Sequence, residues 1–371
     1  MVDAAAVVDK MSKLPSIKLG KAEEKHSSNL PQLLEQLNCS LVITTYQAGQ
    51  VITIGRNSRE LAFGFCSFPQ AMGVARTPSG LALASKHEVW SLNGQRELAA
   101  AIEPAGAYDI AFLTRSCHIT GPVMSHELAW CGGDLVVVNT LCNCLAVLEA
   151  PWSFKPIWKP PFIPDTTPSD RCHLNGLAIT EDGSTPAYVT MHGISDIESG
   201  WRDNKATGGA VLEISTGRIL TGDLSMPHSP RLHQGELYAL NSGKGELLRI
   251  DRQSGEYEVV AQLPGFTRGL DLIGNIAVVG LSRIRESAVF GGLPLQERQK
   301  DLRCGVAFVD LTRGELQGYC WFESGVEEIF SVLVIPGYRN PKIIGPISKA
   351  DEFDDTSQAI WLVPSLLEIE S

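Results

Sequence analysis

The chain has 371 residues, 44% of them hydrophobic and 20% charged, which is an ordinary composition for a globular protein. Its formal net charge of −11 argues against nucleic acid or an anionic membrane surface as a partner, because both attract clustered Lys and Arg. Acidic residues interrupt the first segment and no apolar run reaches about 18 residues. With nine cysteines in no framework spacing, we expect a cytoplasmic protein with reduced thiols.

The N-terminal region is predicted to be an extension of the main fold. Residues 1–39 contain a short helical pattern at residues 30–37, which we expect to plug or cover one end of the molecule. Residues 40–371 form the second predicted region. It consists of strand-like runs joined by tight turns, with no long amphipathic helix between them.

One pattern of short strands recurs along this second region. Its clearest copy occupies residues 236–260, and residues 40–55 follow the same order of strands and turns. Four short strands in a period of roughly 40 to 50 residues are typical of a propeller blade. The sequence therefore predicts an all-β fold, a single β-propeller with four-stranded blades.

The number of blades depends on how the two ends of the repeat are counted. The first copy shows no inner strand, whereas the last one runs from an inner strand at 331–334 through further strands at 342–345 and 360–363. We favour seven blades, with six as the alternative, and expect the termini to complete shared blades. Two stretches longer than normal blade loops, residues 103–124 and 283–303, are predicted to be functional lids.

Histidines occur near the beginnings of several predicted inner strands. Superposing these strands places His173, His228 and Glu328 in one register, together with Gln70, Met124 and Phe266, and His126 follows two residues later. Strand alternation then directs three imidazoles and a carboxylate into one mouth of the channel. We predict that His126, His173 and His228 bind a divalent metal ion, with Zn, Fe, Mn, Cu and Ca left open. The alternative is that these histidines satisfy turn backbones.

Further side chains are expected around the same mouth. Glu328 is predicted to be a ligand or general base, with His118 folding over the mouth and Arg231 on the wall as further catalytic residues. His87 and His192 lie in turns on this face and are weaker candidates. Converging guanidinium, amide and indole groups suggest a carboxylated ligand, although each arginine could equally form a salt bridge. The predicted substrate-binding residues are Asn175, Trp201, Arg202, Asn241, Arg268, Arg283 and Arg285.

Several segments resemble an uncharacterised bacterial β-propeller family of conserved hypothetical proteins. They are residues 40–49, 126–130, 171–178, 200–202, 226–231, 265–270 and 328–330. The resemblance covers nearly the whole chain and implies the fold rather than an activity. The family tends to carry Asp-x-Asp-x before the His-Glu-Leu-Ala segment, where this chain has Pro122-Val123-Met124-Ser125, which implies altered chemistry. More distantly, the architecture is similar to gluconolactonase and strictosidine-synthase propellers, whose metal or substrate sits at the channel mouth.

These observations together predict a metal-dependent hydrolase or lyase. Its substrate is expected to be a small, carboxylated organic molecule bound at the mouth of the channel. One alternative is an oxidative enzyme with His-ligated iron or copper, and another is a non-catalytic propeller that binds a peptide or partner. The oligomeric state is left open.

Overall fold

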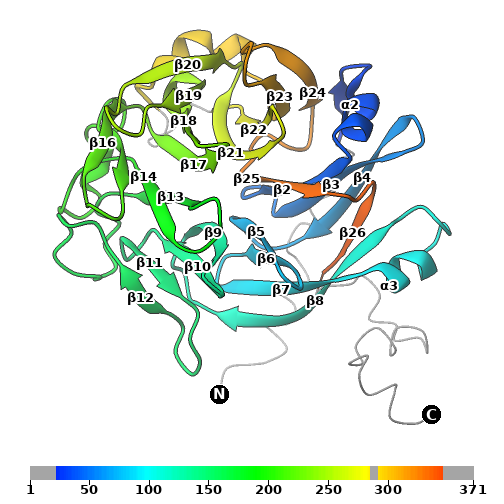
Figure 1. The fold of residues 1–371 in the computed structure, drawn as a ribbon, viewed down its shortest axis with the longest axis horizontal. Coiled ribbons are helices and arrows are strands. Elements are labelled where there is room, and N and C mark those ends of the chain that lie inside the picture. The colour runs from blue at the N-terminus through cyan, green and yellow to red at the C-terminus, as the bar shows by residue number, and fades with distance from the viewer. Residues whose placement is uncertain (1–21, 285–290, 346–371) are drawn as a thin grey trace, which may run out of the picture.

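The computed structural model describes residues 22–284 and 291–345, which form a six-bladed β-propeller (Figure 1). Each blade is a four-stranded antiparallel meander, and its first strand lines the central channel. The inner strands are β5 (Val74–Thr77), β9 (Ser125–Cys131), β13 (Leu174–Ile179), β17 (Pro227–His233), β21 (Phe266–Ile273) and β25 (Ser331–Pro336).

In the first five blades the outer three strands follow the inner strand along the chain, whereas in the sixth they precede it. Those of the first two blades are β6 (Gly80–Ala84), β7 (Glu88–Gln95) and β8 (Ile110–Ile119), then β10 (Asp134–Asn139), β11 (Cys144–Val147) and β12 (Lys155–Trp158). The next two blades use β14 (Pro186–Met191), β15 (Gly209–Glu213) and β16 (Ile219–Leu224), then β18 (Glu236–Asn241), β19 (Glu246–Ile250) and β20 (Tyr257–Gln262). The fifth contains β22 (Ile276–Ser282), β23 (Gly305–Asp310) and β24 (Leu316–Phe322), and the sixth β2 (Cys39–Thr45), β3 (Gln50–Asn57) and β4 (Glu60–Ser67).

The sixth blade is assembled from both ends of the described chain. β25 pairs antiparallel with β2, from Cys39 opposite Pro336 to Thr44 opposite Ser331. The inner strand that the first copy lacks is therefore supplied by the last copy, so seven blades is wrong and the alternative of six is confirmed. β26 (Pro341–Ile344) does not start a blade of its own but adds to β8 in parallel. The strand predicted at 360–363 lies outside the described residues.

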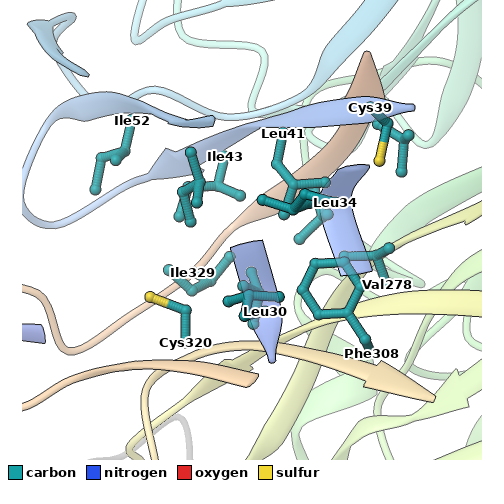
Figure 2. Packing of buried hydrophobic residues seen from close by; sticks show 14 of the residues in the cluster. Leu30, Leu34, Cys39, Leu41, Ile43, Ile52, Val278, Phe308, Cys320 and Ile329 are labelled. Carbon is teal, nitrogen blue, oxygen red and sulfur yellow. The ribbon is translucent and has the colours of Figure 1, made fainter. Parts of the chain in front are cut away.

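The N-terminal segment packs on the rim of the propeller. β1 (Glu24–His26) adds a fifth strand beside β24, and α2 (Leu30–Gln36) follows it. Leu30 and Leu34 of this helix are fully buried in a cluster with side chains of the fifth and sixth blades, including Leu41 and Phe308 (Figure 2). The predicted helix is confirmed. Its expected position over an end of the channel is wrong, because its apolar face fills the junction between two blades (Figure 1).

The two long insertions adopt different structures. Residues 103–124 contribute mainly to β8, the fourth strand of its blade and preceded by the short helix α3 (Arg96–Ala101), so the prediction of a lid there is wrong. Residues 283–303 contain the 3₁₀ segment η3 (Pro294–Asp301), and Leu293 and Leu295 pack with Trp201 and Phe266. The described part of this insertion, residues 283–284 and 291–303, therefore lies beside the end of the channel where the inner strands begin, and residues 285–290 lie outside the described residues.

The cysteines are unpaired, as the sequence predicted. All nine cysteines are free, and burial raises the pKa of Cys172 to about 12. Such thiols are inert at neutral pH because the reactive thiolate is scarce. Within residues 22–284 and 291–345, no helix is long and apolar enough to cross a membrane.

Candidate functional site

Four histidines gather where the inner strands begin, and we call this the His-lined end of the channel: His126, His173, His192 and His228. The ring centroids of His126 and His173 are 4.9 Å apart, those of His173 and His192 4.4 Å, and those of His192 and His228 4.8 Å. Two of these rings also lie within hydrogen-bond distance of each other, with Nε2 of His192 3.3 Å from Nε2 of His228. The structure thus brings the three predicted histidines into one continuous run of rings, with His192 as the link.

The register of these histidines differs from the predicted one. Ser125, Leu174 and Pro227 each lie opposite the last residue of the neighbouring second strand. His126 and His228, one residue later, are therefore equivalent, and Asn175 is their counterpart in the intervening blade. His173 precedes that position by two residues. Superposition on apolar residues alone misplaced His228 because the inner strands contain bulges, as between His228 and Arg231.

His192 was predicted only as a weaker candidate on this face, and the repeat itself shows why it belongs to the site. It directly follows its second strand, the position that Thr140 and Ser242 occupy in the flanking blades. Those two hydroxyls lie 2.8 Å from Nδ1 of His126 and 2.9 Å from Nδ1 of His228. In the blade between them the two residue types are exchanged. Asn175 occupies the position on the inner strand where the neighbouring blades have histidine, and His192 occupies the position after the second strand where they have a hydroxyl. An alignment of blades on second-strand ends would have shown that exchange.

Fixed acceptors hold the Nδ1 atoms of three of these rings. Nδ1 of His126 lies 3.0 Å from the carbonyl oxygen of Met124, and Nδ1 of His228 lies 2.9 Å from that of Met226. Nδ1 of His173 lies 2.9 and 3.1 Å from the two carboxylate oxygens of Asp170. Carbonyl oxygens accept and cannot donate, so the proton sits on Nδ1 and the Nε2 lone pair is left for another partner. Metal-binding histidines show this same support of the distal nitrogen.

Burial keeps three of the rings neutral. It lowers the pKa of His126, His192 and His228 well below the usual value, and neighbouring imidazoles and Arg268 lower it further. Nδ1 of His192 is buried and has no hydrogen-bond partner among the described residues. At neutral pH this end of the channel therefore presents lone pairs, which suit a cation or a hydrogen-bond donor.

Asp170 is a member of the site that the sequence analysis missed. Its carboxylate accepts from Nδ1 of His173 and, at 3.0 Å, from Nε1 of Trp201, whose ring lies 4.4 Å from the ring of His173. Trp201 is 2% exposed. The predicted role of Trp201 in contacting substrate is therefore wrong, because its indole is buried and supports the orientation of Asp170 and His173.

The rings do not all converge on one point. Among the described residues, no three or more His, Cys, Asp and Glu side chains are grouped so that they could hold a metal ion. The rings of His173 and His192 are stacked at only 24° to each other. The lone pairs of stacked rings point in parallel directions and do not meet at one ion. His192 and His228, whose Nε2 atoms face each other, are therefore the two histidines best placed to share an ion.

Glu328 lies near the His-lined end but is paired with an arginine. Its carboxylate accepts from Nη1 of Arg268 at 3.2 Å and from the backbone N–H of Gln47 at 3.3 Å. Burial raises its pKa, against the opposing effect of Arg268. The same burial lowers the pKa of Arg268 to about 10, and its guanidinium lies 3.5 Å from the ring centroid of Phe330. Phe330 in turn contacts the ring of His126 at 5.2 Å.

Most of the predicted substrate-binding polar groups already have protein partners. Asn175 accepts from the hydroxyl of Thr190, although its Nδ2 is buried without a partner among the described residues. Asn241 bridges the backbone of Ser225 and the side chain of Glu246, and Arg283 donates to two backbone carbonyls. The guanidinium of Arg202 is exposed and lies 4.4 Å from the ring centroid of Trp201. Arg285 lies outside the described residues.

Two predicted catalytic residues are elsewhere in the fold. His118 is on β8, the fourth strand of its blade counted from the channel, and its Nε2 lies 2.7 Å from the carbonyl oxygen of Ser153. Arg231 lies farther along the channel than His228, where it donates to Glu127 at 2.8 Å and lines a cavity at the other end. The predictions that His118 covers the mouth and that Arg231 acts there are wrong. His118 is on an outer strand of its blade, and Arg231 lies toward the end of the channel where the inner strands end.

Comparison with known proteins supports the fold and a family. No curated protein matches the chain. A solved protein of unknown function from Bacteroides caccae is similar with a TM-score of 0.50 and 11% identity over 80% of this chain and 99% of that one. A chain of a nidogen/laminin complex has a TM-score of 0.49 and 10% identity over 81% and 98%. Residues 28–344 match the family described as a domain of unknown function, DUF4915, and the chain therefore belongs to that family.

Proposed function

We propose that the chain is a metal-dependent enzyme whose divalent ion is held at the His-lined end of the channel, where it acts on a small, carboxylated organic substrate. The observation that carries the proposal is the 3.3 Å separation between Nε2 of His192 and Nε2 of His228. Two nitrogens each ~2.0–2.1 Å from one tetrahedral Zn²⁺ are ~3.3 Å apart. An ion between them would bind the Nε2 lone pairs of both rings, with the proton of His192 then on Nδ1.

The donor set narrows the choice of ion. Neutral imidazoles suit Zn, Fe and Cu, whereas Ca²⁺ and Mn²⁺ prefer oxygen ligands. His192 and His228 would supply two ligands. His173 would supply a third after rotating out of its stack on His192, with Asp170 holding its Nδ1 proton. His126 is the next imidazole in the run and the remaining candidate for this coordination position.

The reaction class we propose is hydrolysis or lyase-type proton abstraction. A bound ion supplies polarisation of a carbonyl or a lowered pKa for water. Glu328 is the carboxyl that would move a proton, since burial shifts its pKa upward, toward the range where a general base or acid works best. Arg268 would orient a substrate carboxylate through N–H groups beyond the Nη1 that contacts Glu328.

The alternatives have less support. Oxidative chemistry at iron or copper would use the same imidazoles, so identifying the ion separates it from hydrolysis. A peptide-binding propeller would need exposed aromatic and arginine side chains at this end. Trp201 is buried and Arg283 donates to backbone carbonyls, which leaves Arg202 as the exposed member of the predicted set within the described residues.

Metal analysis of the purified protein and titration with Co²⁺, followed by visible absorption, test the proposal. We expect one ion per chain and a ligand-field spectrum, with affinity reduced more than ~100-fold in His192→Ala and His228→Ala. His233→Ala is the matched control because His233 ends the same strand as His228. The proposal fails if neither copurified metal nor a Co²⁺ spectrum is found, or if all three variants bind equally.

A further inference from the structure

The opposite end of the channel contains a cavity that the proposed metal chemistry does not use. It has a volume of about 420 Å³ and lies where the inner strands end, lined by Arg76, Trp130, Arg231 and Asp271 among apolar side chains. This volume is within the ~300–1,000 Å³ range of small-molecule sites. We call it the ion-pair end of the channel.

Two arginine–carboxylate pairs cross the channel here. Arg231 on β17 reaches Glu127 on β9 at 2.8 Å and donates to the carbonyl oxygen of Leu177 on β13, the strand between them. Arg76 on β5 reaches Asp271 on β21 at 3.2 Å and donates to the carbonyl oxygen of Val334 on the intervening β25. Each pair therefore ties three inner strands together and separates this cavity from the His-lined end.

The two pairs differ in exposure. The side chain of Arg231 is 21% exposed and that of Glu127 only 6%, whereas the side chain of Arg76 is 48% exposed. Within the described residues, the polar contacts of Arg76 all use Nη1. Asp271 accepts from the backbone N–H groups of Leu272 and Val334 as well as from Arg76. A carboxylate has about four acceptor sites, so one remains.

We infer that this cavity binds the zwitterionic head of an α-amino acid, with the amino-acid side chain against Trp130 and the apolar wall. Arg76 and Asp271 present opposite charges 3.2 Å apart. The ammonium and carboxylate of an α-amino acid are joined through one carbon, so they can face this pair in the reverse order. Arg76 is matched by Asp271 and Arg231 by Glu127, so a zwitterion preserves the charge balance of these pairs and an anion does not.

Trp130 supplies the second element of recognition. Its indole is 36% exposed at the edge of the cavity, although large apolar groups are usually covered. Leu128, Leu177 and Leu333 line the same cavity. An aromatic or branched apolar side chain would cover the indole and gain both burial and ring contact.

Isothermal titration of the full chain with L-phenylalanine tests the inference, alongside N-acetyl-L-phenylalanine and L-phenylalaninamide, which each lack one charge. We expect saturable binding of L-phenylalanine and affinities roughly tenfold or more weaker for both derivatives, because each loses a charged hydrogen bond. No binding of L-phenylalanine, or equal binding of the three compounds, overturns it.

Variants then locate the site. Arg76→Gln and Trp130→Ala should each weaken L-phenylalanine roughly tenfold or more, and Trp130→Ala leaves the ion pairs intact if loss of Arg76 unfolds the chain. Arg249→Gln, on an outer strand, is the matched control and should bind as the parent does. Unchanged binding in folded Trp130→Ala contradicts the inference. Co²⁺ binding at the His-lined end should be unaffected in all three, so this test is independent of the metal proposal.

Discussion

The two ends of the channel keep buried polar groups stable in opposite ways. At the His-lined end the rings are neutral, each Nδ1 of His126, His173 and His228 has an acceptor, and lone pairs are left over. At the ion-pair end, full charges are retained and cancelled by partners across the channel. An end with spare lone pairs is suited to an ion, whereas an end with matched charges is suited to stability and to ligands of no net charge.

The largest expected effect comes from breaking the more buried ion pair. Arg231→Met leaves the Glu127 carboxylate buried without its partner, which should lower the free energy of unfolding by ~3–5 kcal/mol in urea denaturation. Arg249→Met removes a surface pair with Glu258 and should cost at most ~1 kcal/mol. Replacing both partners, with Glu127→Leu and Arg231→Met, should restore much of the loss. Equal effects of the two arginine variants would contradict this contrast.

A smaller effect is expected from Asp170→Asn. The change weakens the charged hydrogen bonds to His173 and Trp201, so it should lower the free energy of unfolding by ~1.5–3 kcal/mol. It should also weaken Co²⁺ binding ~10–100-fold, an effect that a merely structural role would not produce. Asp165→Asn, in the same loop but exposed, should leave Co²⁺ binding unchanged and lower the free energy of unfolding by at most ~1 kcal/mol, because it loses an exposed pair with Arg171. Unaltered Co²⁺ affinity in Asp170→Asn would exclude its positioning role.

The metal-free protein should lose stability in mild acid because of the His-lined end. The pKa values of His126, His192 and His228 are lowered in the folded chain, so below pH ~6.5 the unfolded chain binds more protons. Above that pH these histidines are neutral in both states and do not change the stability. Below it, each histidine should lower the free energy of unfolding by up to ~1.4 kcal/mol per pH unit. Urea midpoints from pH 8 to 5 measure this slope, which should be shallower in His228→Gln. A flat profile would contradict the pKa shifts.

The smallest effect is expected at the exposed arginine beside the site. Arg202→Ala removes a guanidinium stacked on Trp201 and should lower the free energy of unfolding by only ~0.5–1 kcal/mol. Arg202→Lys should retain part of that contact. If Arg202→Ala leaves stability unchanged but abolishes turnover of an identified substrate, Arg202 belongs to the substrate site as the sequence suggested.

Local pattern was sufficient to predict most strands and the sharing of a blade between the two ends of the repeat, but not the number of blades. Periodic apolar residues mark β9, β18 and the other inner and second strands, because their alternation reflects burial within a single strand. The pairing of β25 with β2 joins residues nearly 300 positions apart along the chain, as in Thr44 opposite Ser331. The missing inner strand of the first copy indicated a shared blade, but neither segment records which strand completes it, and the blade count was overestimated by one.

The sequence predicted that His126, His173 and His228 share one end of the channel, but not which groups orient them. His126 and His228 follow from strand position, since inner strands share one axis. Asp170 and His173 depend on left-handed backbone conformations, with φ of 46° and 51°, that turn the chain just before β13. Such conformations are uncommon for residues other than glycine and cannot be identified from residue type alone. Glu328 was placed at the correct end, but its pairing with Arg268 needed the three-dimensional arrangement.

The sixth blade, built from β25 and β2, has a consequence during synthesis. β2 emerges from the ribosome early, yet its inner neighbour is among the last strands to be translated. Until then the nascent chain carries the open edge of a strand that is fully buried in the finished fold, and this edge can pair with other polypeptides. Translation must therefore reach residue 336 before the ring can lock, and a ribosome that stalls earlier would release an incomplete toroid prone to aggregation.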